Sequence, residues 1–234
     1  MNLYFEYFYC EDEQRRSEFD FCIQSNINSK LFKNINAVVP CGKIPLYLLE
    51  AEKRNEITLH FDKSNILQLE DGIFVNSDQK RTTFQQIFDL SDISTQDKDI
   101  NIVCNLDIWF DDSINLLQGR INQDIAIGLS RWYPEDDHYM VTGCHMDGKA
   151  APGSNDVWAW VGKCKVKNGD FFLGYTACDC RIMKCFEEAG YRVYNPAKSI
   201  KTWHKHKGRG PTPPEVPGPY WKSPSDHHSI EDVK

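Results

Sequence analysis

Two polar residues at the end of one apolar run are the first candidates for chemistry in this chain. Asn105 and Asp107 follow residues 100–104, whose β-branched side chains are typical of a strand buried in a parallel sheet. Ligands of open α/β sheets bind beyond the carboxyl ends of the strands, and residues two apart on an extended segment face the same side. Such an oxygen pair can bind Mg²⁺ or Mn²⁺, ions that commonly keep substrate phosphates in their other positions. We interpret the pair as a metal site that shares its cation with a phosphate-bearing ligand.

An acid at the end of a strand is also a common helix cap. Asp111, Asp112 and Ser113 stand where a cap for a helix over residues 114–119 belongs, so we assign them to capping. This assignment leaves Asn105 and Asp107 without a capping role.

The second half of the chain adds further candidates. Asp156 begins a predicted strand after a long connection, and Asp179 stands at the start of a predicted helix. His204 and His206 lie on one face if their segment is extended, with the positive charge of Lys205 between them. Cations and imidazoles beside a metal suit a pyrophosphate leaving group, because positive charge stabilises the negative charge that develops on it.

Each of these candidates has a structural alternative. Asp156 can simply begin its strand, and Asp179 can cap its helix. Trp158 and Trp160 follow Asp156, and aromatic side chains dominate protein cores more often than they form sugar-binding surfaces.

Strand and helix patterns alternate along most of the chain. We expect strands at residues 3–9, 35–39, 56–61, 100–104, 124–129, 156–161 and 191–194, and helices at 11–27, 45–52, 82–90 and 178–189. This alternation implies βαβ units and a largely parallel sheet. Residues 133–155, between the predicted strands 124–129 and 156–161, have the length and composition of a binding loop. Six of the eleven prolines lie at 211–224, so we expect one domain over 1–207 and an extended or disordered tail over 208–234.

Composition narrows the class of protein. A net charge of −7 over 234 residues argues against nucleic-acid binding, which needs a basic face. We see no signal segment and no apolar run long enough for a membrane span. Nine scattered cysteines suit reduced thiols in the cytoplasm. Cys178 and Cys180 could join the two histidines in a zinc site, although their CxC spacing is atypical for zinc.

Several short motifs occur in a fixed order, and together they resemble the short GT-A-type glycosyltransferases of bacteria and large DNA viruses. The resemblance covers about residues 1–207 and includes Arg81. The motifs that carry it are Asn105-Leu106-Asp107, Leu129-Ser130-Arg131-Trp132, Asn155-Asp156-Val157-Trp158, Cys178-Asp179-Cys180-Arg181, Asn195-Pro196 and His204-Lys205-His206.

The resemblance implies a GT-A fold, a Rossmann-like α/β fold whose mostly parallel central sheet is flanked by helices. It also implies a nucleotide diphosphate sugar donor and a divalent cation, Mn²⁺ or Mg²⁺, on a DXD-type motif. Here that motif is Asn105-Leu106-Asp107, with an amide in place of the first acid. We therefore expect Asp107 as the main ligand and Asn105 as a weaker or water-mediated one, with His204 or His206 as a further ligand or phosphate contact. Cys180 is a second departure, since Asn is expected there.

The implied activity is transfer of a sugar to an acceptor hydroxyl, such as one on a glycan, and we favour inversion because a single base suffices for it. Asp156 is the first candidate for that base. The resemblance suggests nucleotide or phosphate contacts from Arg81, Asn105, Asp107 and Lys205. It suggests sugar or acceptor contacts from Arg131, Trp132, Trp158, Asp179 and Arg181, with Asp179 also the second candidate for the base.

Two other functions fit similar residues. A metal-dependent phosphoesterase or nucleotidyltransferase also places acids at strand ends, although we find no Gly-rich phosphate loop near the amino terminus. A catalytically silent carbohydrate-binding protein on the same scaffold is the other alternative, because Asn105 replaces an acid of the metal motif.

Overall fold

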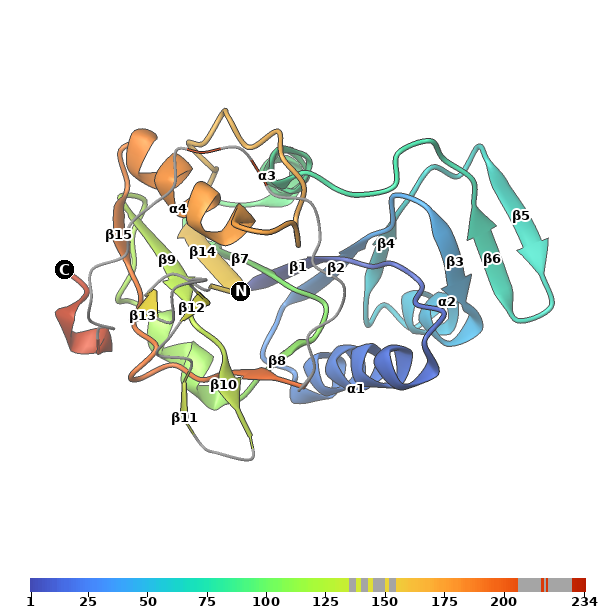
Figure 1. Ribbon diagram of the computed structural model, residues 1–234, viewed down its shortest axis with the longest axis horizontal. Helices are drawn as coiled ribbons and strands as arrows, with labels where there is room; N and C mark the ends of the chain where they lie inside the picture. Colours follow the sequence, from blue (N-terminus) through green and yellow to red (C-terminus); the bar gives the residue numbers. More distant parts are fainter. Residues whose placement is uncertain are drawn as a thin grey trace.

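The computed structural model describes residues 1–134, 138–139, 143–144, 150–151, 155–205, 216, 218 and 229–234. Its centre is a seven-stranded sheet (Figure 1). The strands lie in the order β15 (Arg192–Tyr194), β9 (Ile125–Leu129), β14 (Val157–Val161), β7 (Ile100–Cys104), β1 (Asn2–Glu6), β2 (Asn34–Val38) and β4 (Thr58–His60). Neighbours pair in parallel except β14, which runs antiparallel to both β7 and β9. The mostly parallel sheet confirms the predicted α/β class, while the reversal of β14 was not predicted.

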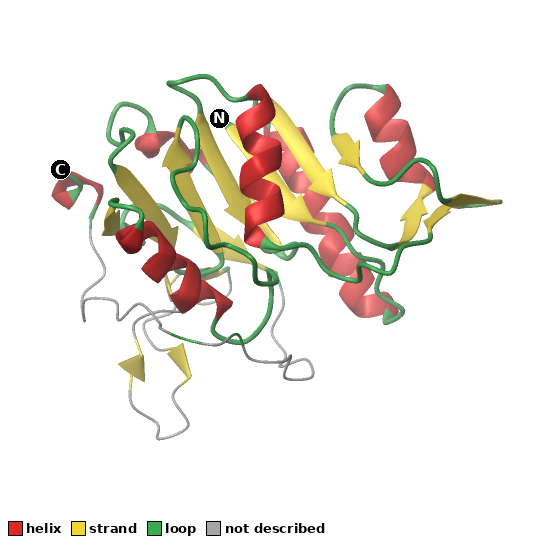
Figure 2. Cartoon of the chain, turned by 90° about the horizontal axis from the view of Figure 1, so that it is seen from above, coloured by secondary structure: helices red, strands yellow, loops and turns green. Residues whose placement is uncertain are grey.

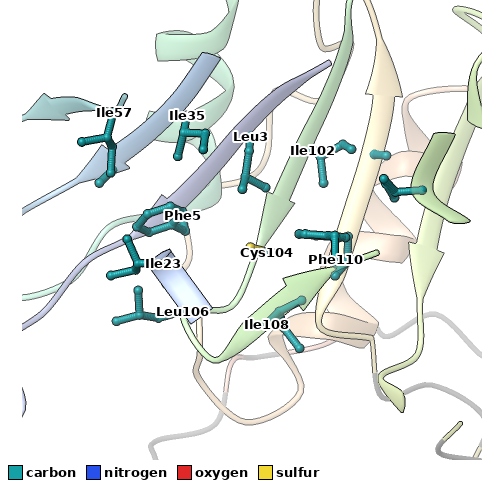
Figure 3. Packing of buried hydrophobic residues seen from close by; sticks show 14 of the residues in the cluster. Leu3, Phe5, Ile23, Ile35, Ile57, Ile102, Cys104, Leu106, Ile108 and Phe110 are labelled. Carbon is teal, nitrogen blue, oxygen red and sulfur yellow. The ribbon is translucent and has the colours of Figure 1, made fainter. Parts of the chain in front are cut away.

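Helices cover both faces of this sheet (Figures 1 and 2). On one face lies α1 (Glu13–Ser29), and on the other lie α3 (Phe84–Ser94) and α4 (Cys178–Glu188). Alternate residues of β1 point to opposite faces. Leu3 and Phe5 therefore join Ile23 of α1 in one core cluster, which Figure 3 shows, while Tyr4 joins the cluster of α3 and α4. Because both faces are covered, the central strands are apolar on both sides.

The helices begin at polar caps. The side chain of Asp12 accepts a hydrogen bond from the backbone of Arg15 at 2.7 Å, at the start of α1. Thr83 and Gln86 form a capping box at the start of α3. Asp111 accepts from the backbone of Ser113 at 2.9 Å and caps η1 (Asp112–Leu117), a 3₁₀ helix. The capping role predicted for this acidic stretch is thereby confirmed for Asp111.

Smaller sheets flank the central one. A sheet of β3 (Gly42–Pro45), β6 (Gly72–Val75) and β5 (Ile66–Leu69) lies with α2 (Leu46–Lys53) at one end of the molecule (Figure 1). Another contains β11 (His138–Tyr139), β10 (Trp132–Tyr133), β16 (Thr202–His204) and β8 (Ile108–Phe110), and β12 (Gly143–Cys144) pairs with β13 (Ala150–Ala151). The antiparallel register of β16 and β8 sets His204 opposite Ile108, beside Asp107.

Two described parts of the predicted tail pack against the rest of the chain. Val216 is buried, and its backbone N–H donates to the carbonyl of Thr176 at 3.0 Å. Ile230, in the short 3₁₀ helix η2 (Ile230–Asp232), and Val233 are buried in the same core cluster as β1. Apolar side chains at these positions contribute to the core, and the extended or disordered character of residues 208–234 stays a prediction. The domain boundary at residue 207 stays a prediction.

Within the described residues, no helix combines the length and the apolar character that a membrane crossing requires. Eight cysteines are free thiols: Cys10, Cys22, Cys41, Cys104, Cys164, Cys178, Cys180 and Cys185.

Candidate functional site

Three chain segments meet at one edge of the central sheet because β14 is reversed. The end of β7, the end of β9 and the start of β14 lie together there. The backbone N–H of Asn105 donates to the carbonyl of Asp156 at 2.9 Å, and the backbone N–H of Asp156 donates to Leu129 at 3.1 Å. Two candidates that lie far apart in the sequence, Asn105 and Asp156, are thus neighbours.

The carboxylate of Asp156 is held by an amide and a cation. Asn105 donates from Nδ2 to Asp156 Oδ1 at 2.6 Å, and Arg131 Nη1 lies 3.4 Å from Asp156 Oδ2. Arg131 also donates from Nε to the hydroxyl of Tyr133 at 3.0 Å. The pKa of Arg131 is raised, chiefly by the charge of Asp156 and against the effect of burial. Asp156, only 6% exposed, is therefore a positioned and charge-paired carboxylate.

Asp107 lies in the turn between β7 and β8 and is 7% exposed. Its Oδ2 accepts from Arg15 Nη2 at 2.5 Å and lies 3.1 Å from His204 Nε2. Burial pushes the pKa of Asp107 upward, but His204 and Arg15 outweigh it and hold the pKa well below its usual range. Asp107 is therefore ionised at neutral pH.

The other oxygen of Asp107 suits a cation. Oδ1 is buried and has no hydrogen-bond partner within the described part of the chain. Buried carboxylate oxygens are normally paired, and an Mg²⁺ or Mn²⁺ site commonly takes one or two carboxylates and completes its shell with phosphates and water. Of the residues that the structure places, no three His, Cys, Asp or Glu side chains group around a metal position. The carboxylate of Asp107 therefore fits a cation that also binds a phosphate ligand. The described protein side chains do not supply a complete coordination shell by themselves.

Arg15 is the site residue that the sequence patterns did not reveal. It lies in the first turn of α1 and is 92 positions away from Asp107 in the sequence. An arginine on an amphipathic helix ordinarily contacts solvent, and no spacing rule links it to a turn so far along the chain. Only the packing of α1 under the central sheet brings the two together.

Asp179 occupies a third position near this edge. Its Oδ1 accepts from the backbone of Cys180 at 2.8 Å, and its Oδ2 accepts from the backbone of Asn155 at 3.3 Å. The helix cap itself is Ala177, in a left-handed conformation, so Asp179 does not serve as the N-cap. Burial, and to a smaller extent the charge of Asp156, raises the pKa of Asp179 to about 6. A carboxylate with such a pKa accepts a proton readily near neutral pH.

A network of buried polar side chains is connected to Asp179. Asn195 donates from Nδ2 to Ser130 Oγ and to Asn155 Oδ1, each at 3.0 Å. The network links residues beside β15, β9 and β14, and Asn155 continues it to Asp179. Asn155 and Asn195 belong to the motifs of the sequence resemblance, but nothing in the sequence predicted their contact.

The side chains of other predicted residues contact partners other than Asp107. Arg81 donates from Nε and Nη2 to both carboxylate oxygens of buried Glu6, at 2.9–3.1 Å. The ammonium of Lys205 lies 4.3 Å from the centre of the Phe21 ring. Arg181 Nη1 lies 3.8 Å from Glu188 on its own helix.

The two tryptophans predicted to contact sugar belong mainly to the core. Trp158 has no exposed surface, and its ring meets Phe84 edge-on with centroids 5.0 Å apart. Trp132 is buried as well, and its indole N–H donates to the carbonyl of Ala197 at 2.9 Å. The sugar-binding role expected of Trp158 is wrong in this structure, because neither face of the ring is accessible. His206 lies outside the described residues, as do most of residues 133–155.

Comparison by sequence finds no matching family model and no matching curated protein. Solved structures do match. One is the mannosyltransferase PcManGT from Pyrobaculum calidifontis in complex with GDP-Man and Mn²⁺, 13% identical, with a TM-score of 0.54 over 89% of this chain and 57% of that one. Another is TarS from S. aureus, 8% identical, with a TM-score of 0.49 over 88% of this chain and 36% of that one.

At these identities the likeness concerns the fold alone. The chain has the GT-A fold that its motifs implied, with a mostly parallel central sheet. It spans a little over half the length of the mannosyltransferase that it matches.

Proposed function

We propose that this protein is a glycosyltransferase that moves a sugar from a nucleotide diphosphate donor to an acceptor hydroxyl with the help of Mn²⁺ or Mg²⁺. The observation that carries the proposal is Asp107, an ionised, nearly buried carboxylate beyond a central strand, with one oxygen unpartnered among the described residues. The GT-A fold supports it, since the structurally similar mannosyltransferase is a complex with GDP-Man and Mn²⁺. The narrower similarity to short bacterial and viral enzymes stays part of the proposal.

In this proposal Asp107 holds the cation, with His204 beside it and Asn105 as a weaker or water-mediated ligand. The bound cation would neutralise the charge that develops on the diphosphate as it leaves. Lys205, whose backbone N–H donates to the carbonyl of Asp107 at 3.1 Å, belongs to the same wall of the site. His206 is the next residue along and stays a predicted ligand or phosphate contact.

The two acids that are candidates for the base divide into different roles. Asp156 accepts a hydrogen bond from Asn105 and faces Arg131, so both of its carboxylate oxygens already have neighbours in the protein. Asp179, whose pKa is raised to about 6, is the better base. We assign Asp179 as the base. It takes the proton of the acceptor hydroxyl while the hydroxyl oxygen attacks the anomeric carbon. The bond from that carbon to the diphosphate breaks and the configuration inverts, while Asp156 and Arg131 orient the sugars.

Donor binding and transfer give separate tests of these roles. A panel of nucleotide diphosphate sugars is screened with Mn²⁺ by thermal shift, since a true donor stabilises the fold by binding, and the best donor is then assayed for hydrolysis and for transfer to glycans. Asp107→Ala should lose metal-dependent donor binding and activity. Asp179→Asn should bind the donor as the wild type does and lose transfer by at least about 100-fold, the usual weight of general base catalysis.

Asp112→Asn is the matched control, because Asp112 is an exposed acid on η1. Full activity in both Asp107→Ala and Asp179→Asn would contradict the proposal.

One observation favours a second candidate, a silent carbohydrate-binding protein. The metal motif has only one carboxylate, and Arg15 already pairs with it. Such a protein would bind glycan but neither nucleotide nor Mn²⁺, so calorimetry with and without Mn²⁺ separates the two functions. A phosphoesterase or nucleotidyltransferase would instead release sugar phosphate or need a nucleoside triphosphate.

A further inference from the structure

We infer that Arg15 competes with the divalent cation for the carboxylate of Asp107, and that a donor diphosphate relieves this competition by binding the Arg15 guanidinium. The inference rests on the proposed function, in which Asp107 holds the cation. It makes metal and donor bind together, each weakly without the other.

The competition follows from the contacts of the carboxylate. Arg15 Nη2 and His204 Nε2 both reach the same oxygen of Asp107, Oδ2. A guanidinium has five donors, no acceptor, and no accessible neutral form, so Arg15 can only repel a metal ion. His204 differs, because a neutral imidazole can give its lone pair to a metal. A cation arriving at Asp107 thus meets one possible ligand and one fixed positive charge.

Burial strengthens this repulsion. The carboxylate of Asp107 is nearly inaccessible, and charges at such sites are screened less by water and salt. The charged groups packed nearby do not remove the conflict. Glu18 pairs with Arg15, while Lys205 adds a further positive charge over Phe21. A metal ion alone therefore has to displace or tolerate a well-placed guanidinium.

Arg15 also has the contacts needed to release Asp107 without leaving the site. Its Nη1 donates to Glu18 Oε2 at 3.0 Å, and its guanidinium lies 4.5 Å from the centre of the Phe19 ring. The Asp12 cap fixes its backbone at the start of α1. The side chain is 24% exposed, so an anion can reach it. The flat guanidinium matches a phosphate with two parallel hydrogen bonds.

The expected behaviour is reciprocal coupling. If diphosphate draws Arg15 away from Asp107, it raises the affinity for the cation, and the cation raises the affinity for diphosphate by the same factor. A direct metal–phosphate contact would add to this coupling, so the part due to Arg15 has to be isolated by substitution.

Binding of Mn²⁺ alone, measured from the electron paramagnetic resonance signal of the unbound ion, tests the inference without any assay of activity. Arg15→Gln should bind Mn²⁺ about tenfold more tightly than the wild type in the absence of nucleotide. It should also bind UDP or GDP more weakly in the presence of Mn²⁺, so that the coupling factor falls. Arg15→Met, which keeps apolar packing on Phe19, should show the same shifts if the glutamine variant folds poorly.

Arg16→Gln is the matched control. It removes the same charge from the same helix turn, but Arg16 donates to the hydroxyl of Tyr9 at 3.1 Å and to the carbonyl of Cys10 at 2.9 Å, and it has no contact with Asp107. Its Mn²⁺ affinity should equal that of the wild type.

The outcomes separate the two proposals. If the wild type binds Mn²⁺ with a nucleotide diphosphate, but the Arg15 variants bind Mn²⁺ alone no more tightly, the inference is overturned and the proposed function stands. An equal gain in Arg16→Gln would also overturn it, because bulk charge would then explain the effect. If no variant binds Mn²⁺ with or without either nucleotide, the metal-dependent function fails, and the inference fails with it.

Discussion

Asn105 Nδ2 donates a hydrogen bond to Asp156 Oδ1 at 2.6 Å, and this contact joins the end of one central strand to the start of its antiparallel neighbour. It gives a structural reason for the amide at the first position of the proposed metal motif. A carboxylate at position 105 would face the carboxylate of Asp156 at the same edge. The amide of Asn105 donates a hydrogen bond to this carboxylate, whereas an ionised acid at position 105 would repel it.

Asn105→Asp should therefore destabilise the protein when metal is absent. Two carboxylates would share one partly buried site, and like charges at such distances oppose each other. We expect a melting temperature several degrees below that of the wild type in EDTA, with most of the loss recovered in Mn²⁺. Asn105→Ala, which loses the hydrogen bond without adding charge, should show no such recovery. An Asn105→Asp variant as stable in EDTA as the wild type would contradict this account.

Asp179 should make stability depend on pH in the direction opposite to most acids. Its pKa in the folded protein is about 6, above the value of about 3.9 for an unperturbed Asp. The stability that the protonated side chain contributes is present below pH 4 and is lost as the pH rises through about 6. Asp179→Asn should therefore have a higher free energy of unfolding than the wild type at pH 7.5, and this difference should vanish near pH 4. Urea unfolding at each pH measures it.

The same raised pKa predicts the pH profile of transfer. The wild-type rate should fall as the pH drops below about 6, because Asp179 is then protonated and cannot act as base. A constant stability gain for Asp179→Asn across this range, or a flat rate profile, would show that Asp179 titrates elsewhere.

The pair of Glu6 and Arg81 should contribute mainly to stability. Glu6 is buried and accepts from Arg81 and from the backbone of Thr82 at 2.9 Å. Arg81→Gln leaves a buried carboxylate without its cation, a change that costs about 3–5 kcal/mol. Adding Glu6→Gln should recover part of this loss in a double-mutant cycle measured by urea unfolding. Normal stability with lost donor affinity in Arg81→Gln would instead favour the nucleotide contact predicted for Arg81.

Asn195 should matter for both stability and turnover. Asn195→Ala removes the hydrogen bonds to Ser130 and Asn155, and each buried group that loses a partner costs about 1–3 kcal/mol. Because Asn155 donates from its backbone to Asp179, the maximal rate should fall more than donor affinity. Asn168→Ala, at an exposed position, is the control and should leave both unchanged. Equal rates in the two variants would show that the network does not position Asp179.

Much of the fold follows from local patterns in the sequence. The apolar runs of β7, β9 and β14 are strong strand signals, and the repeating Phe84, Ile87 and Phe88 mark the buried face of α3. The direction of β14 could not be predicted in this way, because the apolar pattern of a strand is the same for both directions in the sheet. Its reversal depends on how the connection from β10 returns to the sheet, which no local pattern records.

The site was predictable where it follows a strand and unpredictable where it depends on packing. Asn105 and Asp107 follow a strand, so the rule that ligands bind beyond the carboxyl ends of strands was enough to select them. Asp156 precedes its strand and was selected because it follows a long connection. Arg15 reaches Asp107 only because α1 packs under the sheet. Trp158 shows that closeness to a site residue in the sequence can also mislead. It lies two residues after Asp156, but every side chain of β14 is buried.

The reversal of β14 also has a consequence for how such a protein can diversify. Since β9 ends and β14 begins at the same edge, a short hairpin would be enough to connect them, and the sheet does not depend on the length of the chain between them. Deletions, grafts from homologues or inserted modules at residues 135–154 should leave the register of β9 and β14 unchanged, although β11, β12 and β13 lie within that range. A library randomised only there is the economical place to look for altered ligand preference in a protein whose central sheet is unchanged.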